Sequence, residues 1–298
     1  MEHQANILRS ITYIKQHLKS QLTARQIADH AGYSTSHFCK IFSHYQKTPL
    51  MDYVRTMRLI AARQELLHRA KIIDVALDYG FQTASGFSKA FRKTFGYSPS
   101  IYLDRHATLG SETPSSFVHF NPEEVIIDFR YKRSFKVAGF GIETTSSRES
   151  TKDIAAYWEM YVGENLEQKM YDLLDPPAHG EVGVCVSSPE SKTVTYLFGV
   201  IVQDYSKITK EMMTCTIPSA NYVVFTTPPV DNIETVSSYQ EDPLAEMVKE
   251  TWRYIFLEWF PKSGYLFDES KLDFEFYDER CHGLKQLVMD IYIPIKKA

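Results

Sequence analysis

The chain repeats one short pattern, and this repetition constrains its fold more than any other feature of the sequence. GYSTSHFCKIFSHYQKTP begins at Gly32, and GFQTASGFSKAFRKTFGYSP begins 48 residues later, at Gly80. Each copy opens with a glycine and an aromatic residue, and each later contains the spacing Phe-x-Lys-x-Phe. A solenoid needs three or more repeats. Two copies therefore indicate a duplicated module rather than a repeat array.

Each copy is typical of two helices joined by a tight turn. In the first copy, Thr23 and Gln26 have the spacing of a capping box at the start of a short helix. Gly32 suits the turn, because glycine adopts positive φ without steric cost, and Ser34 or Thr35 caps the next helix. Four apolar residues of that helix recur at helical spacing and are expected to be buried: Phe38, Ile41, Phe42 and Tyr45.

This arrangement is a helix-turn-helix, whose second helix enters the major groove of DNA. Small polar residues can bond base edges, and lysine can reach guanine or phosphate. The DNA-contact candidates are Ser34, Thr35, Ser36, His37, Cys39 and Lys40 in the first copy, and Ala84, Ser85, Ser88, Lys89, Arg92 and Lys93 in the second. A solvated face of an ordinary helical bundle would look similar in one copy, but its repetition favours DNA.

A long helix is expected between the two copies. Thr48 is its predicted N-cap and Pro49 its first residue. About 20 residues at ~1.5 Å each span roughly 30 Å, close to the ~34 Å between successive major grooves on one face of DNA. One chain can therefore read two adjacent grooves, so a monomer could occupy an operator.

Charge and cysteine content agree with a DNA-binding protein of the cytoplasm. Residues 1–110 contain 15 Lys and Arg against 7 Asp and Glu, whereas residues 111–298 contain 18 against 30. A basic first part suits a polyanion. The four cysteines form no CxxC pair, so neither a zinc ribbon nor a disulfide framework is predicted. No apolar run reaches 18 residues and no signal peptide is evident, so we expect no membrane partner.

The first hundred residues resemble the DNA-binding domain of the AraC/XylS family. The resemblance rests on GYSTSHFCKIF, YVRTMRLIAARQELL and IIDVALDYGFQTASGFSKAFRKTFGYSPSIYL, and it implies transcription regulation by two helix-turn-helix units. Lys47 departs from the pattern, because the family usually has glycine there. Ala84 and Gly86 leave few side chains in the second copy that could reach bases. We therefore expect this copy to hold phosphates, mainly through Lys89, Arg92 and Lys93.

A region rich in Ser, Thr, Pro and Gly separates this part from a second one. We assign residues 1–108 to a DNA-binding domain, 109–121 to a linker and 122–298 to a second domain. Beyond the linker the expected order β-β-α-β-β occurs twice, with helices over 150–174 and 242–259. The predicted fold is thus an all-α double helix-turn-helix followed by an α+β domain made of two similar halves.

The second part lacks the sequence patterns of common catalytic and cofactor sites. GxSxG, GxGxxG, GxxxxGK and HExxH are all absent. His119, His179 and His282 are far apart in sequence, so we expect them to pair with nothing at ligand spacing. Adjacent residues such as Cys281 and His282 would face opposite ways on a strand. We therefore predict no catalytic residue, metal or cofactor. The prominent feature is a high content of tyrosine and tryptophan, which can line sites for organic ligands and cations.

The segment WRYIFLEWFPKSGYLFDESKLDFEFYDE, with the later DIYIPI, resembles the GyrI-like effector-binding domain of bacterial regulators. The resemblance covers about residues 124–296 and implies an aromatic pocket with Glu275 at its floor and Tyr222 and Trp252 in its wall. Strand alternation places Asp273, Glu275 and Tyr277 on one face. A carboxylate among aromatic rings would attract a lipophilic cation. The ligand-site candidates are Glu275, Tyr222, Trp252, Tyr277 and Tyr157.

These features together predict a bacterial transcription regulator. Its partners would be double-stranded DNA, a small organic and lipophilic cationic effector, and RNA polymerase. Two alternatives for the second domain remain: a hydrolase in which Glu275 and a nearby tyrosine exchange protons, and a module whose aromatic groove binds a segment of another protein. A regulator without any ligand is a further alternative.

Overall fold

The computed structural model describes residues 2–68, 71–109, 118–145, 150–188, 193–232 and 242–298. The chain divides into two compact units, Met1–Leu103 and Asp104–Ala298. Most of the expected linker, residues 110–117, lies outside the described residues. No helix of the described part is long and apolar enough to cross a membrane.

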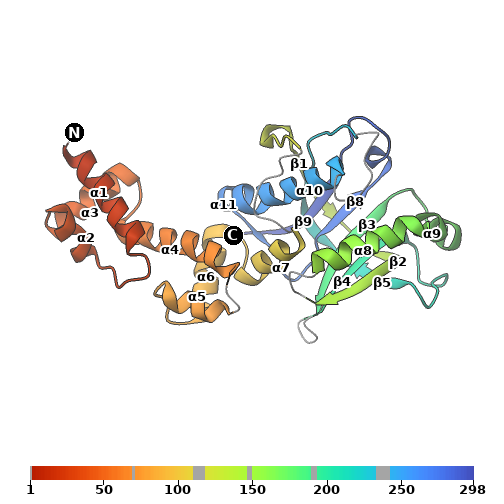
Figure 1. Ribbon diagram of the computed structural model, residues 1–298, viewed down its shortest axis with the longest axis horizontal. Coiled ribbons are helices and arrows are strands. Elements are labelled where there is room, and N and C mark those ends of the chain that lie inside the picture. Colours follow the sequence, from red (N-terminus) through yellow and green to blue (C-terminus); the bar gives the residue numbers. More distant parts are fainter. Residues whose placement is uncertain (1, 69–70, 110–117, 146–149, 189–192, 233–241) are drawn as a thin grey trace. The chain divides into compact units, whose positions relative to one another are not determined.

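The first unit is helical, as predicted, and contains the two helix-turn-helix motifs (Figure 1). Its helices are α1 (Glu2–Gln16), α2 (Ala24–Ala31), α3 (Thr35–Gln46), α4 (Leu50–Leu66), α5 (Ile72–Asp78), α6 (Ala84–Phe95) and α7 (Pro99–Leu109). The pairs α2–α3 and α5–α6 are the two copies of the repeated pattern. Helix α4 connects them, and its 17 residues give a length of roughly 26 Å. Helix α7 begins in the first unit and ends in the second.

The predicted helix and turn signals are present at the first motif. The Thr23 hydroxyl accepts from the Gln26 amide at 3.2 Å, while the Thr23 amide donates to the Gln26 side chain at 2.8 Å, which confirms the capping box. Gly32 has a φ of 77° and ends α2 in the left-handed conformation. Gly80 has the same conformation in the second motif, and a Cβ there would lie 2.8 Å from Nη1 of Arg58.

Two local predictions for the first motif are wrong. Tyr45 is 45% exposed, although Phe38 and Phe42 are fully buried as expected. It lies in the last turn of α3, beyond the hydrophobic cluster that ends there at Phe42. Pro49, rather than Thr48, occupies the N-cap of α4, because its backbone is still extended, with a ψ of 145°.

The second unit is built on one antiparallel sheet, in agreement with the predicted α+β domain. Its strands follow the order β1-β6-β9-β8-β3-β4-β2-β5, and β7 pairs with β9 outside this path. The strands are β1 (Ile126–Lys132), β2 (Phe135–Thr145), β3 (Glu181–Ser188), β4 (Thr193–Val202), β5 (Met213–Ile217), β6 (Ala220–Thr226), β7 (Tyr265–Phe267), β8 (Phe274–Tyr277) and β9 (Asp290–Lys297). Pairing of β8 with β3 joins the second half of the domain to the first.

Helices accompany each half of this sheet (Figure 1). They are α8 (Ser150–Gly163) and α9 (Leu166–Leu174) in the first half, and α10 (Pro243–Tyr254), a π-helical turn (Ile255–Trp259) and α11 (Phe260–Ser263) in the second. The single helix expected over 150–174 is interrupted, because Asn165 adopts a left-handed φ of 52°. The strand expected from residue 286 begins only at Asp290, since Gln286 also has a positive φ, 55°.

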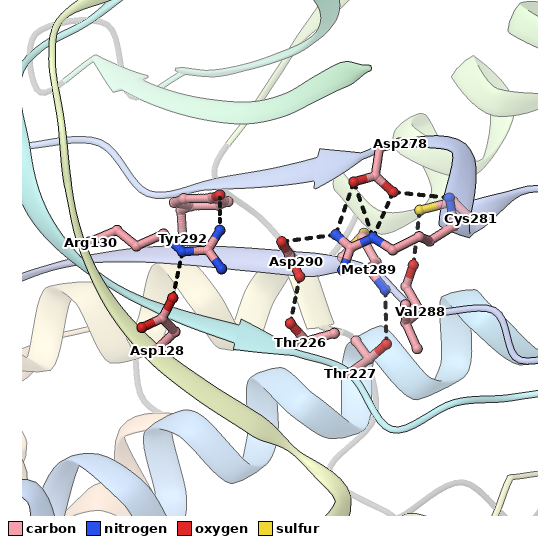
Figure 2. Close-up of polar contacts among 11 residues, drawn as sticks. Asp128, Arg130, Thr226, Thr227, Asp278, Cys281, Val288, Met289, Asp290 and Tyr292 are labelled. Atoms are coloured by element: carbon pink, nitrogen blue, oxygen red, sulfur yellow. Dashed lines mark hydrogen bonds and ion pairs between the residues drawn. The ribbon is translucent and has the colours of Figure 1, made fainter. Parts of the chain in front are cut away.

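A polar network ties the segment after β8 to the start of β9 (Figure 2). Asp290 is buried, accepts from the Thr226 hydroxyl at 2.6 Å and pairs with Arg280 at 2.9 Å. Arg280 also pairs with Asp278 at 2.9 Å. These contacts fix the short turn Glu279–Cys281, and with it the residue that follows, His282.

Candidate functional site

Glu275 lies in the middle of the sheet on β8 and is held by two neutral donors. Its Oε1 accepts from the indole nitrogen of Trp252 at 2.8 Å, and its Oε2 accepts from the Tyr277 hydroxyl at 3.0 Å. Trp252 comes from α10, whereas Tyr277 is two residues along β8 on the same face, as strand alternation predicts. Burial raises the pKa of Glu275, and the two hydrogen bonds oppose this change.

An ion pair lies beside this carboxylate. Arg105 pairs with Asp273, and the side chains of the two residues are 16% and 4% exposed. The Arg105 guanidinium also lies over the Trp252 ring, 5.3 Å from its centroid. Burial raises the pKa of Asp273, while the charge of Arg105 opposes this rise. Arg105 belongs to the second unit although its helix begins in the first, and no pattern in the sequence predicts its position beside Glu275.

Aromatic rings extend from Tyr277 along the sheet to α8. Phe198 contacts Tyr277 at 5.2 Å between ring centroids and Trp158 at 4.7 Å. Tyr161 contacts the same Phe198 ring at 5.3 Å, and its buried hydroxyl has no hydrogen-bond partner among the described residues. Tyr157 belongs to this cluster and donates to the Phe140 carbonyl at 3.0 Å. Rings from α8, β4 and β8 thus form one wall beside Glu275.

Tyr222 lies apart from this group. It is only 1% exposed, its ring contacts Phe274 and Tyr292, and its hydroxyl donates to the Leu272 carbonyl at 3.0 Å. Phe274 is on the opposite face of β8 from Glu275, because adjacent strand residues alternate. The structure therefore brings together Glu275, Trp252 and Tyr277, joins Tyr157 to them through the aromatic cluster, and leaves Tyr222 in the core on the other side.

The DNA-contact candidates differ in exposure. The exposed ones are Ser34, Ser36, His37, Lys40, Ser85, Lys89 and Lys93. The partly buried ones are Thr35, Cys39, Ala84, Ser88 and Arg92. Cys39 packs against the hydrophobic cluster of the first motif, and the His37 ring meets the Tyr33 ring at 5.4 Å. Lys47 follows α3 with a φ of 56°. Glycine, which is usual at this position in the family, adopts this conformation without steric cost.

Two histidines that were expected to be separate lie together. The rings of His179 and His282 are 5.5 Å apart, and with Glu167 they offer ligand atoms that all lie within 4.8 Å of one another. The expectation that these histidines pair with nothing at ligand spacing is therefore wrong. Antiparallel pairing of Glu181 with Tyr277 explains the contact, because it brings His179, two residues before β3, close to the turn after β8.

Comparison with known proteins identifies two regions. Residues 27–105 match the family model described as helix-turn-helix domain. Residues 130–295 match the model described as integron-associated effector binding protein. The second match covers more than half of the chain.

Individual proteins are similar to one region or the other. The transcriptional activator AarP of Providencia stuartii is 34% identical over 103 residues, which cover 34% of this chain and 76% of AarP. The regulatory protein SoxS of Escherichia coli K12 is 34% identical over 106 residues, which cover 35% of this chain and 99% of SoxS. The solved structure of SAV2435 bound to tetraphenylphosphonium covers 57% of this chain and 94% of its own, with 16% identity and a TM-score of 0.46.

Proposed function

The chain belongs to the family of integron-associated effector binding proteins, and we propose that its effector is a lipophilic organic cation bound beside Glu275. It is a transcriptional regulator with an AraC-type DNA-binding domain followed by a GyrI-like effector-binding domain.

The environment of Glu275 carries this proposal. Its carboxylate is held by two neutral donors, Trp252 and Tyr277, and neither neutralises its charge. Asp273 pairs with the guanidinium of Arg105, whose charge also opposes the rise in the pKa of Glu275 that burial causes. These three groups therefore carry one excess negative charge when all are ionised. A cation beside aromatic rings gains cation–π attraction. An organic cation with a spread charge also loses less hydration on burial than a small ion.

The effector proposal is tested by binding of tetraphenylphosphonium to the full chain. We expect titration calorimetry to detect binding to the wild type and at least a tenfold loss in Glu275→Gln. Glu279→Gln is the matched control, since it removes the same charge from an exposed position four residues along the chain. Equal affinity of the wild type and Glu275→Gln would place the cation elsewhere. Absence of binding to the wild type would exclude this effector class.

For DNA, we propose that α3 reads bases through Ser36, His37 and Lys40, while α6 mainly holds phosphates. Exposed Lys89 and Lys93 on α6 support the second part. The functional domains would be residues 1–108 and 122–298, joined by residues 109–121. A single copy of the chain would then occupy two adjacent major grooves, since both motifs belong to one chain.

We also propose that effector binding proceeds without turnover and changes how the protein engages DNA and RNA polymerase. Both Glu275 oxygens already accept hydrogen bonds, an arrangement suited to holding charge rather than to moving a proton. The site of action would be the cytoplasm, where bacterial DNA lies. Catalytic hydrolysis of an activated ester, lost in Glu275→Gln, would contradict the non-enzymatic part of this proposal.

A further inference from the structure

Arg105 is a cation of the chain itself that occupies the candidate effector site. Its side chain is 16% exposed, and it pairs with Asp273, which is 4% exposed. Its guanidinium lies over the face of the Trp252 ring, 5.3 Å from the centroid. It thus makes the two contacts, with a buried carboxylate and with an aromatic face, that an organic cation would make.

Trp252 links this guanidinium to the proposed effector position. Its ring face receives Arg105, while its indole nitrogen donates to Glu275 at 2.8 Å. An effector cation attracted by Glu275 would therefore lie close to Arg105. Two like charges at such a distance repel strongly where water is largely excluded. Charge repulsion would therefore weaken binding of the effector cation while Arg105 stays in place, and removal of Arg105 would abolish this repulsion.

We propose that Arg105 is a tethered internal ligand that a lipophilic cation displaces from Asp273 and from the Trp252 ring. This inference rests on the proposed function and adds its regulation. Arg105 is carried by α7, which begins at Pro99 within the DNA-binding unit. Displacement would release the end of a helix whose first residues belong to that unit, and effector occupancy would thereby act on α7.

The test compares tetraphenylphosphonium affinities of the full-length wild type, Arg105→Gln and Arg105→Lys by titration calorimetry. We expect Arg105→Gln to bind at least tenfold more tightly, because the competing charge is gone. Arg105→Lys keeps the charge and should remain within threefold of the wild type. Since Arg105→Gln leaves Asp273 without its ion partner, the double variant Arg105→Gln/Asp273→Asn provides a neutral pair if the single variant does not fold.

The outcomes separate this inference from the effector proposal. One outcome is that the wild type binds the cation and that neither Arg105→Gln nor the folded double variant binds it more tightly. Arg105 and Asp273 then form a purely structural ion pair, and the displacement proposal is wrong, while the effector class stands. If the variants bind and the wild type does not, Arg105 blocks the site and displacement by this probe is refuted. If no folded protein binds the cation, both proposals are wrong. Faster hydrogen exchange of peptides covering residues 99–105 on cation binding, seen only in the wild type, supports displacement.

A second, independent observation is the cluster of Glu167, His179 and His282. Their ligand atoms all lie within 4.8 Å of one another, and two imidazoles with one carboxylate suit Zn²⁺. The His179 ring stacks on Tyr171, with an interplanar angle of 19°. The network around Arg280 and Asp290 fixes the turn that precedes His282 (Figure 2).

A buried carboxylate adds to the negative charge around this cluster. Glu181 is 2% exposed and accepts from the Tyr171 hydroxyl at 2.6 Å. A bound dication would be attracted electrostatically by the carboxylates of Glu167 and Glu181.

We infer that Glu167 of α9, with the exposed His179 and His282, forms a Zn²⁺ site whose remaining coordination positions are open to water. Titration of the full chain with ZnCl₂ should show one site and a higher unfolding midpoint. His179→Ala and His282→Ala should each lose at least tenfold in affinity, whereas the control His119→Ala, which changes an exposed histidine elsewhere, should not. No binding to the wild type, or an equal loss in His119→Ala, would overturn the assignment.

Discussion

Replacing Lys47 by glycine should stabilise the DNA-binding unit. Lys47 ends α3 with a φ of 56°, and a left-handed conformation costs an L-residue about 1–2 kcal/mol relative to glycine. Glycine also gains conformational entropy in the unfolded chain, which offsets about 0.4–1 kcal/mol of this difference. The central values of about 1.5 and 0.7 kcal/mol leave a net gain of about 0.8 kcal/mol, or roughly 4 °C in the unfolding midpoint of a unit of this size.

Scanning calorimetry of the full chain measures this change as an upward shift of one transition. Lys47→Ala is the matched control, because it removes the same exposed side chain but keeps a Cβ at the strained φ. We expect its midpoint to stay within about 1 °C of the wild type, since the strain of the Cβ is unchanged. If Lys47→Ala stabilises as much as Lys47→Gly, the side chain and not the backbone is responsible, and the reasoning is wrong.

Three further results are expected. Acidification should weaken binding of tetraphenylphosphonium, because burial raises the pKa of Glu275 and protonation removes its negative charge. The folded chain binds a proton at Glu275 more readily than the unfolded chain does. The contribution of Glu275 to stability should therefore rise as pH falls through its raised pKa. Calorimetric titration at several pH values checks the binding, and Glu275→Gln should respond less. Gly183→Ala should lower the affinity roughly tenfold by crowding the site, since its Cβ would lie 3.3 Å from Glu275 Oε2; the measurement is the same titration, and unchanged affinity would show that the effector does not approach this point. Lys89→Ala should weaken binding to every DNA sequence alike and reduce the salt dependence by about one charge, whereas a changed base preference in mobility-shift assays would assign it to base reading.

Local chemistry explains what could be predicted from the sequence. The capping residue Thr23 and the turn glycine at position 32 act within a few residues of their own backbone, so their signals are visible in a short stretch. The alternation that places Glu275 and Tyr277 on one face likewise needs only the two-residue period of a strand. Similarity to known families added Trp252, which is separated from Glu275 by the π-helical turn, α11 and β7.

Long-range contacts explain what the sequence did not reveal. Arg105 meets Asp273 across 168 positions of the chain, and no periodicity links an arginine on α7 to a carboxylate just before β8. His179 and His282 meet only because β3 pairs with β8. Tyr222 is a further example: its strand could be predicted, but the face of the sheet that it occupies depends on β9, which pairs with its strand, and on β8, which pairs with β9.

The sheet of the second unit has a narrow waist at β8. This strand joins β3 through three residue pairs and β9 through three more, whereas β4 joins β2 through ten. A molecule bound to Glu275 on the waist and to the aromatic wall on β4 would bridge the two broad parts of the sheet and resist shear between them. Such a molecule would strengthen the sheet mechanically. In a single-molecule experiment that pulls on residues 126 and 217, the force needed to unfold the domain should be higher when it is bound.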